Sequence, residues 1–569
     1  MDVDSLLWHL VPMSLALIIV TALAVLWFAE RSVEHLTLAV AALCFSTAVL
    51  LFAVTDLERA ILLSSILAAG IFGASRVKYD HSGIKLIVTD LPLAFAGTVP
   101  FLLAQYPLAL AAVLAGSVAL MLAAVATLVY VRGPPIALEL QVLFFGLACI
   151  SLVAAYKASG GPAIFQRNAA LRRCFLSSFI ASLLNPRSWR QFGELALSDI
   201  AKDPLPLMAA IPARSSDYPD IIVIQHESIF DPRLFGLPVE PVVEAFLSPK
   251  DGLHGSLNVD IFGGGSWQSE FSLLTGLSSA SFGSNAYFLF KRGAGRFHSS
   301  LPKTLSALGY RTMLASSCRR SFLSYDRFYR SIGISERLFT DDFPPPFDVN
   351  RFEATSSDAL FLDAALNAHV KGIADDASPR FLYALTNFNH GPHNRNLVTS
   401  GQFESERVFA AASLPDACYA EYYARLAETA ATWCKLKSEL ASRFPKRKTL
   451  IVHYGDHQPV MTRRIERKLK LDADPRRQFR TFYAIETLND CTDRIPRERG
   501  RDLDIAFLGT VLLQHAGLPL DEIFATRASL LEHCGGAYFA SSSERKRRFH
   551  RTLVDLGLID VAPAVRYQR

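Results

Sequence analysis

The sequence has no CxxC pair, no metal-knuckle spacing, no internal repeat and no low-complexity tract. Its 58 Lys and Arg residues against 53 Asp and Glu residues leave a net charge of only +5, without a basic stripe interleaved with aromatic residues. These absences argue against a zinc-knuckle protein, a repeat architecture and a nucleic-acid partner. Eight cysteines are present. Cys418 could pair with Cys434, or Cys491 with Cys534, in an oxidising compartment, and the sequence leaves this open.

Charge is scarce in the first 157 residues. Asp, Glu, Lys and Arg make up about 10% of this region but about 23% of the remaining chain, an ordinary soluble density. A mean hydropathy of +0.24 agrees with this division. The pattern excludes intrinsic disorder, a collagenous chain and a purely soluble enzyme. It predicts a polytopic α-helical membrane region over 1–157, followed by a globular domain long enough to bury a core.

The apolar segments of the first region predict about five membrane spans. The chain begins Met-Asp-Val-Asp without a basic n-region, so the first segment is not a cleavable signal peptide. Two segments of about 15 residues are short for a span, and one of these could be re-entrant; Leu91–Gln105 is the one left out of the count. The six segments are Leu6–Phe28, Leu36–Val54, Ala60–Ala74, Leu91–Gln105, Pro107–Val131 and Pro135–Tyr156.

The charges of the loops between the predicted spans indicate on which side of the membrane the globular domain lies. Cytoplasmic loops carry an excess of Lys and Arg. With a cytoplasmic N-terminus, Arg31, Arg76, Lys78 and Lys85 would lie outside, against Arg59 and Arg132 inside. Taken alone, this count places the globular domain in the cytoplasm.

The rest of the chain is predicted to form three parts. Residues 158–216 are a juxtamembrane amphipathic linker, whose segment Asn168–Leu184 either lies in the headgroup layer or packs on the globular domain. Residues 217–540 are the catalytic domain. Residues 541–569 form a basic tail, expected as a solvated helix face.

The domain over 217–540 shows an α/β pattern. Short apolar strands are expected at Ile221–Gln225, Arg311–Ser316, Phe381–Thr386 and Thr449–His453. Helical patterns lie between them, at Ser300–Leu308, Ser357–Val370 and Ala417–Leu440. This alternation predicts a mostly parallel, doubly wound sheet whose chemistry lies at the carboxyl ends of its strands.

Polar clusters follow three of these strands. Glu227 follows the first and is either a ligand or the N-cap of the next helix. Asp456 and His457 follow the last, and with Glu227 they offer oxygen and nitrogen donors that suit Mn²⁺ or Zn²⁺. His390 and His393 flank a Gly-Pro turn after the third; a buried, satisfied histidine is the usual alternative to a site.

A fourth cluster is a glycine-rich turn. Gly263, Gly264 and Gly265 precede Ser266, at the mouth of a predicted helix. Glycines let backbone approach a ligand closely, and a helix N-terminus favours an alkoxide or a phosphate. The alternative is a plain serine N-cap. Four such clusters in one α/β domain are far less expected by chance than any one of them.

The order of these motifs resembles the membrane-anchored branch of the sulfatase/alkaline-phosphatase superfamily, which includes lipoteichoic acid synthases and the phosphoglycerol transferases of periplasmic glucans. The resemblance covers most of the chain. It implies metal ligation by Glu227 in an "ES" motif, and by Asp456 and His457 in a "GDH" motif. It makes Ser266, four residues before Glu270-Phe271, the catalytic nucleophile and a fourth metal ligand. His390 in an "NH" turn, and His393 nearby, would bind substrate.

Two departures from the family pattern stand out. The nucleophile is Ser where the family has Thr, and the substrate-binding arginine has no clear counterpart between Arg319 and Arg330, where Arg327 is the first candidate. Sulfatases that make formylglycine need C/S-x-P-x-R, whereas Ser266 is followed by Trp-Gln-Ser-Glu. That argues against a sulfatase activity and leaves phosphoryl chemistry.

The resemblance implies transfer of a phospholipid headgroup, phosphoglycerol favoured, through a covalent Ser266 intermediate to a glycan acceptor in the cell envelope. One divalent metal is implied, manganese first, with zinc or magnesium as alternatives. Phosphoethanolamine transfer and phospholipase-C-like or phosphatase hydrolysis would use the same residues, and a decayed binding module is the non-enzyme alternative. The implied location is the bacterial inner membrane with residues 158–569 on the periplasmic side, against the loop-charge count. The sequence does not indicate an oligomeric state.

Overall fold

A computed structural model of the 569-residue chain forms two compact units, Met1–Gly193 and Glu194–Arg569. The structure describes residues 26–27, 29–30, 32–82, 85–90, 103, 107–161, 174–185, 195–197, 200–214, 217–320, 322–343, 357–375, 378–472, 474–489, 500–539, 541 and 543–561. The predicted span Leu6–Phe28 and the segment Leu91–Gln105 lie almost wholly outside these residues.

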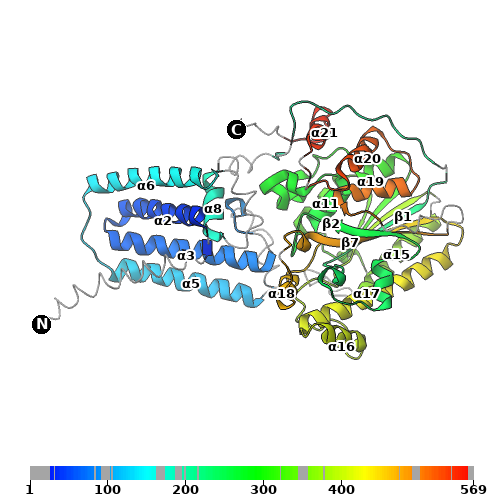
Figure 1. Ribbon diagram of the computed structural model, residues 1–569, viewed down its shortest axis with the longest axis horizontal. Coiled ribbons are helices and arrows are strands. Elements are labelled where there is room, and N and C mark those ends of the chain that lie inside the picture. Colours follow the sequence, from blue (N-terminus) through cyan, green and yellow to red (C-terminus); the bar gives the residue numbers. More distant parts are fainter. Residues whose placement is uncertain are drawn as a thin grey trace. The chain divides into compact units, whose positions relative to one another are not determined.

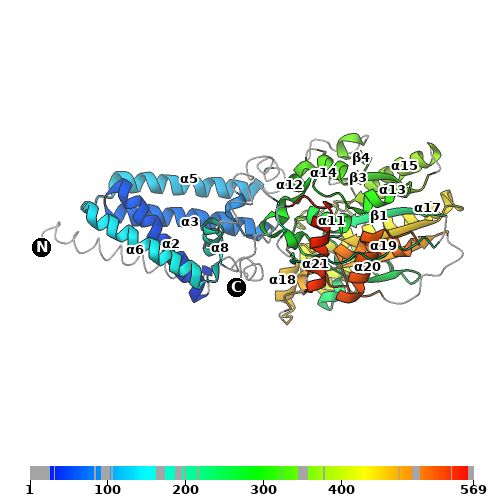
Figure 2. The ribbon, with the colours of Figure 1, turned by 90° about the horizontal axis from the view of Figure 1, so that it is seen from above.

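Within its described residues, the first unit contains four helices that are long and apolar enough to cross a membrane. They are α2 (Val33–Val54), α3 (Leu57–Ser82), α5 (Pro107–Tyr130) and α6 (Leu138–Ala158). Helix α2 packs against both α3 and α6, and α5 packs against α3 (Figures 1 and 2). Large apolar side chains of α5, such as Leu108, Met121 and Leu122, are exposed, as expected of a surface that faces lipid.

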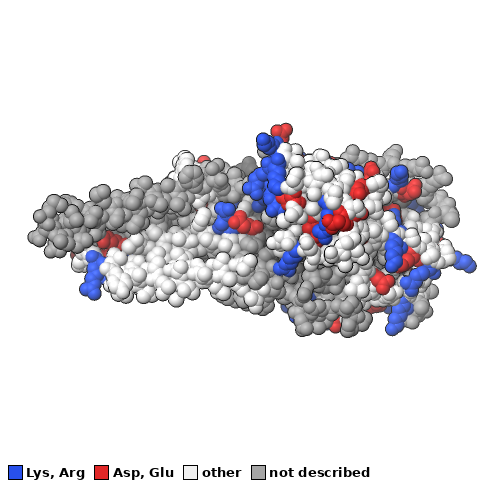
Figure 3. Space-filling view, turned by 90° about the horizontal axis from the view of Figure 1, so that it is seen from below, with Lys and Arg blue, Asp and Glu red and all other residues white. Residues whose placement is uncertain are grey.

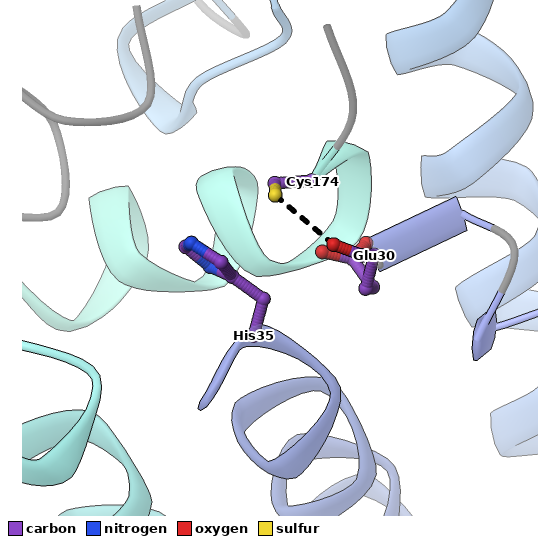
Figure 4. Close-up of side chains that lie close together, drawn as sticks. All are labelled: Glu30, His35 and Cys174. Carbon is purple, nitrogen blue, oxygen red and sulfur yellow. Dashed lines mark hydrogen bonds between the residues drawn. The ribbon is translucent and has the colours of Figure 1, made fainter. Parts of the chain in front are cut away.

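A short helix, α8 (Phe175–Leu184), closes one end of this bundle. It lies buried against α2 and α3. Its main contacts are therefore with the helical unit, and a position in the headgroup layer stays a prediction. Glu30 binds it, because its carboxylate accepts hydrogen bonds from Leu176 N (2.9 Å) and from the Ser177 hydroxyl. His35 and Cys174 lie beside Glu30 (Figure 4). Both carboxylate oxygens of Glu30 are therefore used, and the cluster joins α8 to the start of α2.

The second unit is built on one eight-stranded sheet in the order β4-β3-β5-β1-β6-β7-β2-β8. Most neighbouring strands are parallel, but β7 runs antiparallel to both β6 and β2, which confirms the mostly parallel sheet. The strands are β1 (Asp220–His226), β2 (Leu253–Asn258), β3 (Arg311–Ser316), β4 (Glu336–Leu338), β5 (Arg380–Leu385), β6 (Thr449–Gly455), β7 (Arg480–Leu488) and β8 (Leu503–Asp504). The four predicted strands correspond to β1, β3, β5 and β6.

Helices cover both faces of this sheet (Figure 1). Side chains alternate along each strand, so Ile221 and Val223 face one core while Ile222 and Ile224 face the other. The first core is closed by α11 (Trp267–Thr275), α12 (Leu289–Gly293), α13 (Leu301–Ala307), α14 (Tyr325–Ser331), α19 (Ile505–His515), α20 (Glu522–Cys534) and α21 (Glu544–Asp555). The second is closed by α10 (Pro241–Leu247), α15 (Asp358–Asp375), α16 (Glu404–Ser413), α17 (Ala417–Arg443) and α18 (Thr462–Lys468).

One expectation is wrong in this unit, and one possibility left open by the sequence is excluded. Helix α21 is not a solvated tail, because its Phe549 and Leu553 are buried in the first core. Cys418 and Cys434 do not pair: both lie on α17 as free thiols. Cys534 is also a free thiol, and its proposed partner Cys491 lies outside the described residues.

Candidate active site and metal centre

The predicted ligands meet at the carboxyl ends of two neighbouring strands. Strands β1 and β6 are parallel and in register up to His226 and Gly455. The next residues are Glu227 and Asp456, which therefore leave the sheet side by side. Strand β5 flanks β1 on its other side, so the loop that carries His390 starts at the same edge. The carboxyl edge of a parallel sheet is the usual place for a site.

The glycine-rich turn brings Ser266 to this edge. Gly263, Gly264 and Gly265 have φ values of 78°, 147° and 94°, a backbone that side chains with a Cβ rarely adopt. Gly263 N donates to the carbonyl of Gln458 (2.9 Å), which ties the turn to the loop after β6. The Ser266 hydroxyl makes no cap bond to α11 and instead donates to Glu227 Oε2 at 2.8 Å. The structure thus favours the nucleophile over the plain N-cap.

Four side chains form one compact cluster. His457 Nε2 lies 3.3 Å from Ser266 Oγ, 3.3 Å from Glu227 Oε1 and 3.6 Å from Asp456 Oδ2. Glu227, Asp456 and His457 are 5%, 0% and 2% exposed. One ligand atom from each of these three lies within 4.8 Å of the others. All four predicted ligands are therefore brought together.

The hydrogen bonds around the cluster satisfy one carboxylate oxygen of Asp456 but not the other. Asp456 Oδ1 accepts from Ser228 N and from His457 N, both at 2.7 Å. Asp456 Oδ2 is buried and has no donor among the described residues. Two buried carboxylates side by side are costly without a cation, and an orphaned buried oxygen is expected where an ion binds. The donor set, two carboxylates and an imidazole, fits a divalent transition metal.

The pKa shifts of the cluster also favour a bound cation. Burial, and then the neighbouring Glu227 carboxylate, raise the pKa of Asp456 well above its usual value. Burial alone would raise the pKa of Glu227 as well, but His457 and His390 beside it lower it. The charge of His390 lowers the pKa of both Glu227 and His457, so it acts electrostatically on the cluster.

The two histidines of the β5 loop occupy different positions. His390 is half-buried, near the cluster. His393 is 5% exposed, and its Nε2 contacts the Asn389 carbonyl at 2.8 Å. Burial, together with Arg425, lowers the pKa of His393 to about 3, so its imidazole is neutral. These contacts give His393 a role in holding the loop; its binding to substrate stays a prediction.

Side chains of helix α17 hold the loop after β5 in place, and the sequence did not indicate these contacts. The wholly buried Arg425 donates to the carbonyls of Phe388 (3.3 Å), His390 (3.1 Å) and Arg395 (2.7 Å). One turn earlier, Glu421 accepts from Arg425 Nε and from Leu397 N, both at 2.8 Å. These loop partners are 24–37 residues away in sequence, so no local pattern marks them.

The arginine predicted first is not part of the cluster. Arg327 is exposed on α14, whose buried face carries Tyr325 and Tyr329. Arg319 follows the carboxyl end of β3, which lies beside β5. Its Nε is buried without a hydrogen-bond partner among the described residues. Arg319 is thus better placed than Arg327 to meet a ligand at this edge.

A buried polar network also supports the nucleophile helix. Glu270 on α11 accepts from Tyr329 and, at 3.2 Å, from Gln225 on β1. Burial raises the pKa of Glu270 to about 7. The Glu270-Phe271 dipeptide marked this position in the sequence without indicating its partners.

Comparison with known proteins agrees with this geometry. Residues 219–483 match the Sulfatase family model. An uncharacterized protein of Haemophilus influenzae (strain ATCC 51907 / DSM 11121 / KW20 / Rd) is 26% identical over 316 residues, 54% of this chain and 56% of that protein. The chain thus matches just over half the length of that relative.

The chain is also similar to solved structures. The integral membrane protein lipooligosaccharide phosphoethanolamine transferase A (EptA) from Neisseria meningitidis aligns over 95% of both chains, with a TM-score of 0.50 and 12% identity. Phosphoglycerol transferase GacH of Streptococcus pyogenes, in complex with sn-glycerol-1-phosphate, aligns over 61% of this chain and 87% of its own, with a TM-score of 0.45 and 15% identity. At such identities the likeness shows fold alone, and the EptA alignment extends it to the helical unit.

Proposed function

We propose, from the premise that residues 219–483 form a sulfatase-family domain, that this chain transfers a phospholipid headgroup through Ser266 to an acceptor hydroxyl. The match over residues 219–483 confirms the sulfatase-like domain predicted from the motifs. One observation carries the proposal: the Ser266 hydroxyl lies 2.8 Å from Glu227 within a buried cluster in which Asp456 Oδ2 has no donor among the described residues. A nucleophilic alcohol beside a set of buried metal donors is suited to phosphoryl transfer.

Glu227, Asp456 and His457 would hold one divalent ion, with Ser266 Oγ as a fourth ligand. Manganese is favoured, and zinc or magnesium are the alternatives. Such an ion would supply positive charge that stabilises the Ser266 alkoxide near neutral pH. Its removal by a chelator should abolish turnover, and metal analysis of the purified chain identifies it.

The first half-reaction is an attack of Ser266 Oγ on the phosphorus of the lipid headgroup. The Oγ–P bond forms as the bond from phosphorus to the diacylglycerol oxygen breaks. The hydroxyl proton passes along its hydrogen bond to Glu227 Oε2 and finally to the departing diacylglycerol. His390 and Arg319 would stabilise negative charge on the phosphoryl oxygens from the two neighbouring strand ends.

The second half-reaction frees the enzyme. A hydroxyl of the acceptor, a glycan of the cell envelope, attacks phosphorus as the Ser266 Oγ–P bond breaks, and the proton of that hydroxyl passes to Ser266 Oγ. We favour phosphoglycerol as the group transferred. Phosphoethanolamine transfer, or hydrolysis by water at this step, uses the same residues and differs only in the donor or the acceptor.

A lipid donor accounts for the helical unit, because helices in the membrane keep the site at the headgroups. We place the chain in the bacterial inner membrane with the globular unit on the periplasmic side, where a glycan acceptor would be found. The positive-inside count rests on few charges and favours the opposite side. A periplasmic reporter fused after Arg569 should be active; an inactive fusion of a well-expressed chain would reverse the orientation.

The activity is tested with headgroup-labelled phosphatidylglycerol and phosphatidylethanolamine, supplied separately to membranes containing the wild type, Ser266→Ala or Ser266→Thr. Label should reach a glycan in the wild type and in Ser266→Thr, which keeps the hydroxyl, and not in Ser266→Ala. Label released as a soluble phosphoester would indicate hydrolysis. Equal turnover in the wild type and Ser266→Ala would refute the nucleophile.

A further inference from the structure

We propose that residues 461–480, the basic segment, bind an anionic phospholipid surface beside the active site. The segment carries eight Lys and Arg residues against three Asp and Glu residues. In the view from below Figure 1, Lys and Arg side chains gather at the end of the globular unit where α18 lies (Figure 3). The identity of the partner rests on the proposed function, whereas the surface itself does not.

The basic segment is fixed to the catalytic residues at both of its ends. The Gln458 side chain, next to the ligand His457, donates to the carbonyls of Arg477 and Arg480, each at 2.7 Å. The Arg463 guanidinium lies 4.4 Å from the ring centre of Phe262, which directly precedes the glycine turn. A surface that meets this segment therefore lies next to the nucleophile turn and the metal ligands.

The charges of the basic segment are not balanced within the protein. Arg464 and Lys468 share a single carboxylate, that of Asp416. Two further arginines pair one to one, Arg477 with Glu466 and Arg480 with Asp474. Within the described ranges no ion pair is formed by the exposed side chains Arg467, Lys470 and Arg476. The exposed face thus has a surplus of positive charge.

Helix α21 shows that a basic composition alone does not produce such a face. It is as basic as α18, but its cations are used inside the fold. Lys546 is buried and donates to the carbonyls of Tyr538 and Ser541. Arg547 pairs with Glu544, Arg551 with Asp555, and Arg548 donates to the Pro204 carbonyl. In the basic segment, by contrast, the exposed cations of Arg467, Lys470 and Arg476 form no ion pair among the described residues and are left for an external partner.

The chemistry of that partner follows from the charge and the site. Several cations spread over one exposed segment suit a surface of many phosphates better than one small ligand. Each Lys or Arg near an anionic lipid surface strengthens binding by about fivefold, and salt screens the effect. A site that acts on phospholipid headgroups must meet such a surface. The principal rival is a soluble polyanion, for example a phosphorylated glycan.

Hydrogen exchange of the full chain in lipid nanodiscs tests the proposal without needing turnover. We compare phosphatidylcholine discs with discs that also contain phosphatidylglycerol. In the latter, backbone amides of 461–480 should exchange about fivefold more slowly, and about 0.5 M salt should remove the difference. The triple variant Arg467→Glu, Lys470→Glu, Arg476→Glu should lose this protection.

A matched control makes the same charge change elsewhere. Lys371, Lys435 and Lys446 are exposed on α15, on α17 and before β6. Their triple change to Glu should leave the lipid-dependent protection intact. Equal exchange in both discs, or protection that persists in the basic-segment variant, would overturn the proposal. So would protection by soluble polyphosphate but not by phosphatidylglycerol. Protection in a chain without transferase activity would instead refute the proposed function and support the lipid contact.

Discussion

Arg425 is the residue on which the position of His390 depends most directly. Its side chain is 0% exposed and bonds three loop carbonyls and Glu421. Removing one partner of a buried ion pair costs about 3–5 kcal/mol. Because Arg407 also contacts Glu421 and would partly compensate its charge, we expect the lower end of this range for Arg425→Met. This loss of stability should be confined to the loop over residues 386–398.

Native-state hydrogen exchange on the full chain measures this cost. A loss of about 3 kcal/mol in local stability corresponds to exchange about 100-fold faster. Arg527→Met is the matched control: Arg527 is also wholly buried and donates to a carbonyl, that of Thr275 at 2.6 Å, on another helix pair. It should leave exchange over 386–398 unchanged. Unchanged exchange there in Arg425→Met would refute the reasoning.

Turnover distinguishes a positioning role from a general loss of stability. If Arg425 acts through His390, the double variant Arg425→Met/His390→Ala should be no slower than His390→Ala alone. Arg425→Lys keeps a cation that can reach one carbonyl and should fall between the wild type and Arg425→Met. Additive losses in the double variant would show that Arg425 does not act through His390.

Three further outcomes are expected. Asp456→Asn removes a ligand charge, so bound metal, measured by elemental analysis, should fall by about tenfold or more. Folding raises the pKa of Glu270 from 4.5 to about 7, so burying its charge lowers stability as the pH rises through that window. Glu270→Gln removes this loss, and its melting temperature relative to the wild type should rise from pH 4.5 to 7; a constant difference would contradict the assignment. Arg319→Ala should raise KM for the lipid donor by about tenfold, whereas Arg327→Ala should leave it unchanged.

The part of the site that lies on β1 and β6 could be predicted because its information is local. Each strand is a short apolar run, and each ligand is the first charged or metal-binding residue beyond it. Parallel neighbours then bring Glu227 and Asp456 together without any knowledge of side-chain packing. Strand β7 was missed because it is antiparallel, and β2 was missed because its Gly255 and polar residues give it no apolar run.

Helix α21 shows where composition misleads. Its sequence ERKRRFHR predicts a solvated face, and most of its cations do lie near the surface. Yet Phe549 and Leu553, four positions apart, lie on one side of the helix and are buried in the core. Lys546 follows them inward because two carbonyls accept its protons. Such acceptors belong to another segment, so the sequence of the helix cannot reveal them.

The role of Ser266 was undecided in the sequence because an N-cap and a nucleophile both occupy a helix start. The backbone decides between them. A capping serine takes extended φ and ψ angles, which turn its oxygen toward the amides of the first turn. Ser266 has φ −42° and ψ −37°, already helical, after three glycines with positive φ. This backbone directs Oγ away from the helix amides and toward Glu227. The glycines therefore do more than allow a close approach: they let the helix begin directly after Ser266, the proposed nucleophile.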